Sequence, residues 1–312
     1  MPAPSNKILA ARRKHPSGPV PLKTPSALRP FAASGGQAQW RPFGRLVDGH
    51  SAVYETTLVP PGGTQAAGVA WMDTRLLAAQ LYSGSGSPGG GPYRFSAPIK
   101  PAQAASLVAA FNGGFKMNAA EGGYYTEGRL IDPLRAGAAS LVIYSGGGVN
   151  IGAWGSDVTM TPSVAAVRQN LVLLVDGGRA VPLAATPNWL AWGATCGIYS
   201  CSGPGIENQW RSGLGITSNG ALIYVAGPSL NPWQLAELLV RARAVRAMEL
   251  DINPDWPDFA TYRPSLPGGF ASPDNGTKLL ASMIQGPWTF FEPYWTRDFV
   301  TMSARPRAGQ MR

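Results

Sequence analysis

Two apolar runs joined by an Asn-Gly pair constrain the fold of this chain more than any other stretch. The runs are residues 211–217 and 221–226, and Asn219 and Gly220 lie between them. Asn and Gly adopt positive φ at low cost, as the tight turn of a β-hairpin requires. The sequence therefore predicts a hairpin, and a hairpin of this apolar character must be part of a larger sheet.

The segment after the hairpin predicts a helix that packs on that sheet. Asn231 can cap the helix, Pro232 suits its first position, and Gln234 can complete a capping box. Apolar residues then recur at helical spacing on one face. They are Leu235, Leu238, Leu239, Ala242 and Val245. Residues 247–250 predict a strand that returns to the sheet.

The rest of the chain predicts mainly strands. Residues 51–99 alternate between apolar and polar side chains and are interrupted by Pro and Gly, which is typical of short strands. A short helix is expected over residues 101–109, and further strands over 140–144, 149–154 and 171–175. We therefore expect an α+β fold, in which a mixed, mostly antiparallel sheet is flanked by helices.

The positive charge of the chain lies at its ends. The formal net charge is +9, but residues 1–45 carry eight Lys or Arg and no acid, and residues 297–312 carry four bases and one acid. The body between them is close to neutral, which argues against a nucleic-acid partner. We expect a disordered basic leader over residues 1–36, a single catalytic domain over 37–303 and a basic tail over 304–312.

The cysteines and the apolar runs bear on location. Cys196 and Cys201 lie in a Gly-rich loop, and this spacing suits either a disulfide or two buried thiols. We favour the disulfide, because no zinc-type cluster accompanies the pair, and a disulfide requires an oxidising compartment. No run of 18 apolar residues predicts a transmembrane segment, and the given chain shows no signal peptide. We expect an extracytoplasmic protein, either secreted or at the cell surface.

The scarcity of histidine in the chain narrows the possible kinds of catalytic site. The chain has two histidines, His15 and His50, which argues against a Ser-His-Asp triad or a His-rich metal site. Carboxylates, amides, Arg, Lys and Tyr remain, and they suit glycosyl transfer. Glu249 and Asp251 would share one face of a strand, where each negative charge raises the proton affinity of the other. We expect both to be catalytic, with no cofactor, although a divalent metal is compatible with these residues.

Two Gly-rich segments are candidates for substrate binding. In residues 109–116, glycines next to an amide and a Lys let the main chain approach a ligand closely, although a plain tight turn explains the pattern equally well. Residues 121–133 form a polar, Tyr-bearing loop of the kind that lines sugar sites. The candidate residues are Asn112, Gly113, Gly114, Lys116 and Tyr124.

At these motifs the chain resembles the phosphodiester glycosidase family, and it looks like an actinobacterial branch of it. The resemblance rests on Asn-Gly-Gly-Phe at residues 112–115, on residues 170–178, on the Arg211 hairpin and on Leu-Ala-Glu-Leu-Leu at residues 235–239. It covers about residues 50–300. It implies hydrolysis of the bond between the anomeric carbon of a sugar and a phosphodiester.

The resemblance also implies roles for single residues. It places Asn112, Gly113 and Gly114 at the substrate, Arg211 on the phosphate or in support of the site, and Asp251 at the catalytic centre. The chain departs from the family after Asp251, where the usual Gly-Gly-Gly-Ser is replaced by residues 252–256. This replacement predicts a narrower, more acidic pocket in which Trp256 stacks on a second sugar. The residues expected to contact substrate there are Asn253, Asp255 and Trp256.

The expected function is a glycan hydrolase of the phosphodiester glycosidase type, acting on a cell-envelope glycan or a sugar-1-phosphodiester. Two alternatives stay open from the sequence. One is an ordinary glycosidase that cleaves cell-wall polysaccharide without a phosphate. The other is a non-catalytic glycan-binding or envelope-assembly protein on the same fold. All three have a carbohydrate as partner.

Overall fold

The structure is a computed structural model, and it describes residues 20–32, 36–186, 189–193, 208–252, 254–266 and 268–306. Cys196 and Cys201 lie outside these residues, so the disulfide stays a prediction. Asn253 also lies outside them.

The hairpin predicted around Asn219 and Gly220 is confirmed. Strand β15 (Gln209–Thr217) pairs antiparallel with β16 (Leu222–Leu230), and Gly220 in the turn has a φ of +87°. Helix α2 (Pro232–Arg241) follows with the predicted capping box between Asn231 and Gln234. Strand β17 (Ala244–Ile252) then returns and pairs with β15. The stretch with the strongest local signals therefore forms the centre of the largest sheet.

The described strands form three larger sheets and a two-stranded ribbon. The eight-stranded sheet has the order β1 (Arg41–Pro42), β4 (Val53–Leu58), β5 (Ala67–Met72), β16, β15, β17, β13 (Leu173–Asp176) and β14 (Arg179–Ala180). One five-stranded sheet has the order β11 (Val149–Ala153), β10 (Ala139–Tyr144), β12 (Val164–Gln169), β8 (Tyr124–Thr126) and β9 (Arg129–Asp132). The other has the order β19 (Gly276–Lys278), β18 (Phe259–Tyr262), β7 (Leu107–Asn112), β20 (Phe299–Ala304) and β6 (Leu77–Tyr82). The ribbon pairs β2 (Leu46–Val47) with β3 (His50–Ser51).

Helices are few in the described part of the chain. The α-helices are α1 (Pro101–Ala104) and α2, and the 3₁₀ helices are η1 (Pro182–Ala185), η2 (Trp189–Trp192), η3 (Pro273–Asn275) and η4 (Thr289–Phe291). Neither α-helix has the length and apolar character that a membrane-spanning helix needs.

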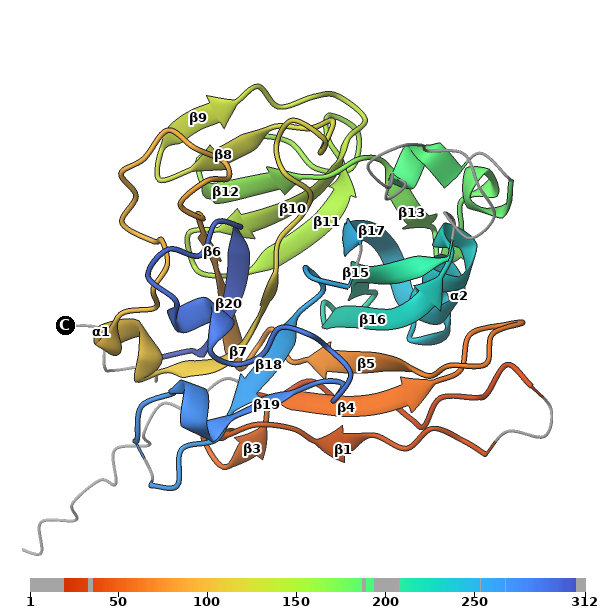
Figure 1. The fold of residues 1–312 in the computed structure, drawn as a ribbon, viewed down its shortest axis with the longest axis horizontal. Helices are drawn as coiled ribbons and strands as arrows, with labels where there is room; N and C mark the ends of the chain where they lie inside the picture. Colours follow the sequence, from red (N-terminus) through yellow and green to blue (C-terminus); the bar gives the residue numbers. More distant parts are fainter. Residues whose placement is uncertain are drawn as a thin grey trace, which may run out of the picture.

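The expected α+β class is wrong, because the fold is built mainly from antiparallel β-sheets. Every pairing between the named strands is antiparallel. The helix expected over residues 101–109 ends at Ala104, because Leu107 begins the buried strand β7. The sheets cover one another's apolar faces, so they need few flanking helices. Figure 1 shows this arrangement, with α2 beside β15 and β16 at the right.

The central strands of the eight-stranded sheet are buried on both faces. In β16, Leu222 and Tyr224 pack in the core between the sheets, whereas Ile223 and Val225 pack on the opposite side with Leu235 of α2. This two-sided burial explains why the run after Gly220 is continuously apolar instead of alternating.

Residues outside the expected domain boundaries of 37 and 303 also contact the body. Leu22 and Leu28 are buried, and the backbone N–H of Leu22 donates to Oδ2 of Asp73 at 2.6 Å. At the other end, Nε of Arg305 donates to the carbonyl of Thr74 at 3.0 Å. We therefore propose that the folded domain includes residues 20–32 and extends to residue 305.

Candidate active site

Strand ends from different sheets meet at one place and bring together residues that are far apart in the sequence. Nδ2 of Asn112, at the end of β7, donates to Oγ of Ser212 in β15 at 3.0 Å. Oγ of Ser212 in turn lies 3.2 Å from both the backbone N and the backbone O of Asp251 in β17. The main chain of Asp251 is therefore fixed by contacts that cross two sheets.

The Asp251 carboxyl group is buried and bonded to an arginine from another segment. Its Oδ2 accepts a hydrogen bond from Nη2 of Arg297, which comes just before β20, and its Oδ1 accepts one from the backbone N of Ile252 at 2.8 Å. Burial raises the pKa of Asp251 to about 7, although Arg297 acts in the opposite direction. A carboxyl group with such a pKa can give up or take a proton near neutral pH.

Arg297 connects Asp251 to an open pocket, which we name the Arg297 pocket. Besides Asp251, its Nη2 donates to the carbonyl of Gly114 at 2.8 Å, and its guanidinium lies 4.7 Å from the ring centre of Trp256. The pocket is lined by Gly86, Ser87, Pro88, Lys116, Met117, Asn118, Asp132, Thr296 and Arg297.

Two buried donors on residues that line the Arg297 pocket have no hydrogen-bond partner within the described part of the chain. They are Nε of Arg297 and the hydroxyl of Ser87, and both residues are 5% exposed. A buried donor without a partner costs free energy, and a ligand that accepts its hydrogen bond recovers that cost. Lys116 is exposed and adds a positive charge, while Asp132 is the acidic residue of the lining. The pocket therefore favours a ligand rich in acceptor oxygens.

A second buried ion pair, between Arg168 and Asp298, lies next to the Asn-Gly-Gly-Phe turn. Nε of Arg168, in β12, lies 2.8 Å from Oδ2 of Asp298, and both side chains are almost fully buried. Arg168 also donates to the carbonyls of Phe115 and Gln169. The pair thereby links the strand that ends at Gln169 to the turn after Asn112.

Close packing explains the glycines of the Asn-Gly-Gly-Phe motif. A Cβ on Gly113 would lie 2.1 Å from Oδ2 of Asp298, and one on Gly114 would lie 2.7 Å from Oδ1 of Asn170. No side chain fits at either position. The polar atoms of the Asn112 amide are also occupied, since its Oδ1 accepts from the Tyr224 hydroxyl at 2.7 Å. These three residues shape the site from within the core.

Glu249 and Asp251 have different partners, although they are two residues apart on β17. Arg211 pairs with Ile252 and Gly213 with Glu249, so β17 has one more residue than β15 between these pairs, which is a β-bulge. Oε1 of Glu249 lies 2.5 Å from Nη1 of Arg211, and both side chains are fully buried. Burial, partly offset by Arg211, raises the pKa of Glu249. Burial is thus the main cause of the raised pKa of both carboxyl groups, and repulsion between the two charges is not.

The remaining predicted residues lie at different depths. Tyr124 is fully buried and its hydroxyl lies 3.1 Å from Oγ of Ser83, so its ring offers no face to a sugar. Arg211 is likewise inside the core. Asp255 is exposed, and Trp256 is half-buried beside Trp295, with ring centres 5.9 Å apart. Trp256 therefore brings the altered loop against Arg297.

Three polar residues of the pocket were not predicted as site residues from the sequence. They are Ser87, Asp132 and Arg297. Asp132 follows an apolar pair at the end of a strand, and Arg297 stands just before the apolar run of β20, so each carried a weak signal. Ser87 lies in a Gly-Ser loop and carried none. Within the described residues, no group of three His, Cys, Asp or Glu side chains is placed to hold a metal ion.

Asp258 is a further buried acid beside the site, and it leads to a prediction about pH. Its backbone N donates to Oδ1 of Asn112 at 3.1 Å, but among the described residues no donor reaches either carboxyl oxygen with good hydrogen-bond geometry, and the Thr289 hydroxyl and the backbone N of Phe259 act on them only weakly. Burial raises the pKa of Asp258 to about 8. The Thr289 hydroxyl, which donates to Gln285 at 3.4 Å, and the charge of Lys278 offset this rise only in part.

We expect Asp258→Asn to weaken the pH dependence of stability. The native state holds a proton on Asp258 that the unfolded state releases above its ordinary pKa of 3.8, so this contribution to stability falls as pH rises and is lost above about 8. The neutral amide does not titrate. Urea unfolding at pH 5 and pH 8 should show a drop in the free energy of unfolding that is smaller in the variant by at least about 1 kcal/mol. Equal drops in both proteins would contradict the assignment.

Comparison with known proteins gives distant structural similarity. No protein-family model matches the sequence, and no curated protein matches it. The chain is similar to the zebrafish N-acetylglucosamine-1-phosphodiester alpha-N-acetylglucosaminidase catalytic domain auto-inhibited by its pro-peptide, with 15% identity, a TM-score of 0.47, and coverage of 86% of this chain and 88% of that one. It is also similar to a hypothetical protein from Synechocystis, with 12% identity, a TM-score of 0.43, and coverage of 88% of this chain and 65% of that one.

Proposed function

We propose that this protein is a glycan hydrolase of the phosphodiester glycosidase type, which cleaves the bond between the anomeric carbon of a sugar and a phosphate. One observation carries the proposal. The Asp251 carboxyl group, which titrates near neutral pH, is bonded to an arginine that also lines a pocket with unpartnered donors. A group for proton transfer and a site for an anion therefore lie next to each other.

The Arg297 pocket suits the phosphate part of such a substrate. A phosphodiester oxygen accepts strong hydrogen bonds from a guanidinium, an ammonium and a hydroxyl group. Arg297, Lys116 and Ser87 supply these three donors. The family resemblance placed Arg211 either on the phosphate or in support of the site. Because Arg211 is fully buried against Glu249, we propose the supporting role.

Asp251 serves as the proton donor in the proposed reaction. A water oxygen bonds to the anomeric carbon while the bond from that carbon to the phosphate oxygen breaks. The proton of Asp251 goes to the leaving phosphate, whose developing charge Arg297 also stabilises, and the water proton is taken up by a base. Asp132, the carboxylate that lines the pocket, is our candidate for that base, because glycosidases use a pair of carboxyl groups.

The proposed location is extracytoplasmic, with an envelope glycan or a sugar-1-phosphodiester as substrate. The support comes from the sequence, where Cys196 and Cys201 have a spacing that suits a disulfide.

Lys116→Met tests the phosphate assignment. We expect the KM for a sugar-1-phosphodiester to rise about tenfold at low salt, because one charge-assisted hydrogen bond of about 1.5 kcal/mol is lost. The KM for an aryl glycoside of the same sugar should not change. Lys100→Met, which removes an exposed lysine outside the pocket, is the control. Equal effects of Lys116→Met on both substrates would refute the assignment.

A further inference from the structure

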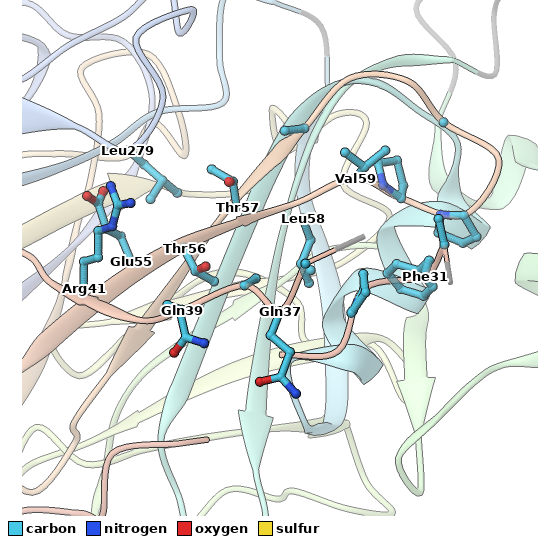
Figure 2. A pocket seen from close by; sticks show the side chains of 18 of the residues that line it. Phe31, Gln37, Gln39, Arg41, Glu55, Thr56, Thr57, Leu58, Val59 and Leu279 are labelled. Atoms are coloured by element: carbon cyan, nitrogen blue, oxygen red, sulfur yellow. The ribbon is translucent and has the colours of Figure 1, made fainter. Parts of the chain in front are cut away.

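A second groove lies between the N-terminal segment and β4, and it shares no residue with the Arg297 pocket. We name it the N-terminal groove. Its lining includes Phe31, Gln37, Gln39 and Arg41 on the N-terminal segment, and residues 55–59 along β4 and just after its end. Figure 2 shows Arg41, Glu55 and Leu279 at one end and Phe31 and Val59 at the other.

The groove exists because the N-terminal segment diverges from β4. Strand β1 pairs with β4 only through Arg41 with Glu55 and Pro42 with Tyr54. Before these residues, Ala38 forms a bridge with Leu28, with both backbone hydrogen bonds at 2.9 Å. The segment therefore turns toward Leu28, and β4 beyond Glu55 borders the groove.

Helix α2 contacts both walls of the groove, the N-terminal segment and the residues that follow β4. The guanidinium of Arg241 lies 4.0 Å from the ring centre of Phe31, and its Nη1 donates to the carbonyls of Arg29 and Pro30 at 2.9 and 2.8 Å. On the β4 side, Nε2 of Gln234 donates to the carbonyl of Pro61 at 3.0 Å. These contacts fix the walls before any ligand binds, which lowers the entropy cost of binding.

The lining has the chemistry of a site for a neutral polyhydroxyl chain. Gln37 and Gln39 are exposed, and Figure 2 shows their amides pointing the same way, as alternate residues of an extended segment do. Amides donate and accept, as sugar hydroxyl groups require. Arg41 stands opposite Glu55, so their charges cancel. Phe31 is half-buried with Arg241 over its ring, and it adds an apolar edge to the lining.

We propose that the N-terminal groove binds a neutral oligosaccharide chain, separately from the Arg297 pocket. The absence of net charge among the ionisable residues of the lining disfavours an anionic ligand, and the paired amides favour one with repeated hydroxyl groups. Such a groove would hold a glycan on the enzyme at a distance from the bond that is cleaved.

The test is a titration of the protein with maltohexaose, cellohexaose and chitohexaose, followed by ¹H–¹⁵N NMR. At least one of the three should shift the side-chain amide signals of Gln37 and Gln39 and the backbone signal of Thr57. The double variant Gln37→Ala, Gln39→Ala should weaken that Kd at least tenfold. Gln65→Ala, which removes an exposed amide outside the lining, should leave the Kd unchanged.

Three results would overturn the proposal. They are no shift at the groove with any of the three sugars, shifts confined to Lys116 and Asn118, and an unchanged Kd in the double variant. Asp251→Asn should bind the same sugar at the groove with the same Kd. If the wild-type protein binds the sugar at the groove but cleaves no sugar-1-phosphodiester, the proposed function is refuted while the groove is supported.

Discussion

Arg168→Met is expected to lower the free energy of unfolding by about 3–5 kcal/mol, because it leaves the Asp298 carboxylate buried without its partner. Met has a similar volume, so little cavity is created. The variant also removes the donors to the carbonyls of Gln169 and Phe115, and buried acceptors that lose their donors add to the cost. Urea unfolding at pH 7 measures the effect.

Arg246→Met is the matched control for this prediction. Nη1 of Arg246 lies 3.6 Å from Oδ1 of Asp157, and the two side chains are 26% and 30% exposed. Water solvates both charges there, so the same substitution should cost less than about 1 kcal/mol. If the two variants lost equal stability, the Arg168–Asp298 pair would not be the support that its burial indicates.

The Arg168–Asp298 pair also shows why the Asn-Gly-Gly motif was ambiguous in the sequence. A Gly beside an amide suits either a ligand contact or close packing. The choice depends on Asp298, which is 185 residues after Gly113 in the chain. A local pattern carries no information about a neighbour at that separation.

The hairpin, the helix cap and the returning strand could be predicted because their signals are local. Turn residues and capping residues act within four positions of one another. These local signals did not predict the fold class. One strand-helix-strand unit does not show whether helices or other sheets pack on the remaining sheets. In this protein the sheets cover each other, and α2 is the α-helix that packs on the large sheet.

The prediction that Glu249 and Asp251 share one face of a strand was wrong for a similar reason. Alternate residues share a face only while the strand is regular, and the bulge opposite Arg211 and Gly213 breaks that rule. The sequence does not mark the bulge with a Gly in β17. Asp251 is thereby brought to Arg297, while Glu249 pairs with Arg211.

Asp251→Asn is expected to reduce turnover at least about 100-fold, the lower end of what a positioned acid or base contributes. The amide keeps the shape of the side chain, and its oxygen can still accept from Arg297, but its NH2 then faces the backbone N of Ile252. We therefore expect a lower free energy of unfolding with the same fold by circular dichroism, and turnover is compared under conditions in which both proteins are folded. Because the pKa of Asp251 is raised to about 7 and the acid form is the proton donor, wild-type activity should fall as pH rises through 7. The residual activity of the variant should not show this fall between about pH 6 and pH 8.

Glu249→Gln and Asp274→Asn complete the comparison. Glu249 is enclosed with Arg211 away from the Arg297 pocket, so its substitution should lower stability more than turnover. Asp274 is exposed on η3 and should matter to neither. Wild-type turnover in Asp251→Asn, on a substrate that the native protein cleaves, would move the catalytic centre away from Asp251. Retained glycan binding with no turnover in any form of the protein would instead identify a binding protein.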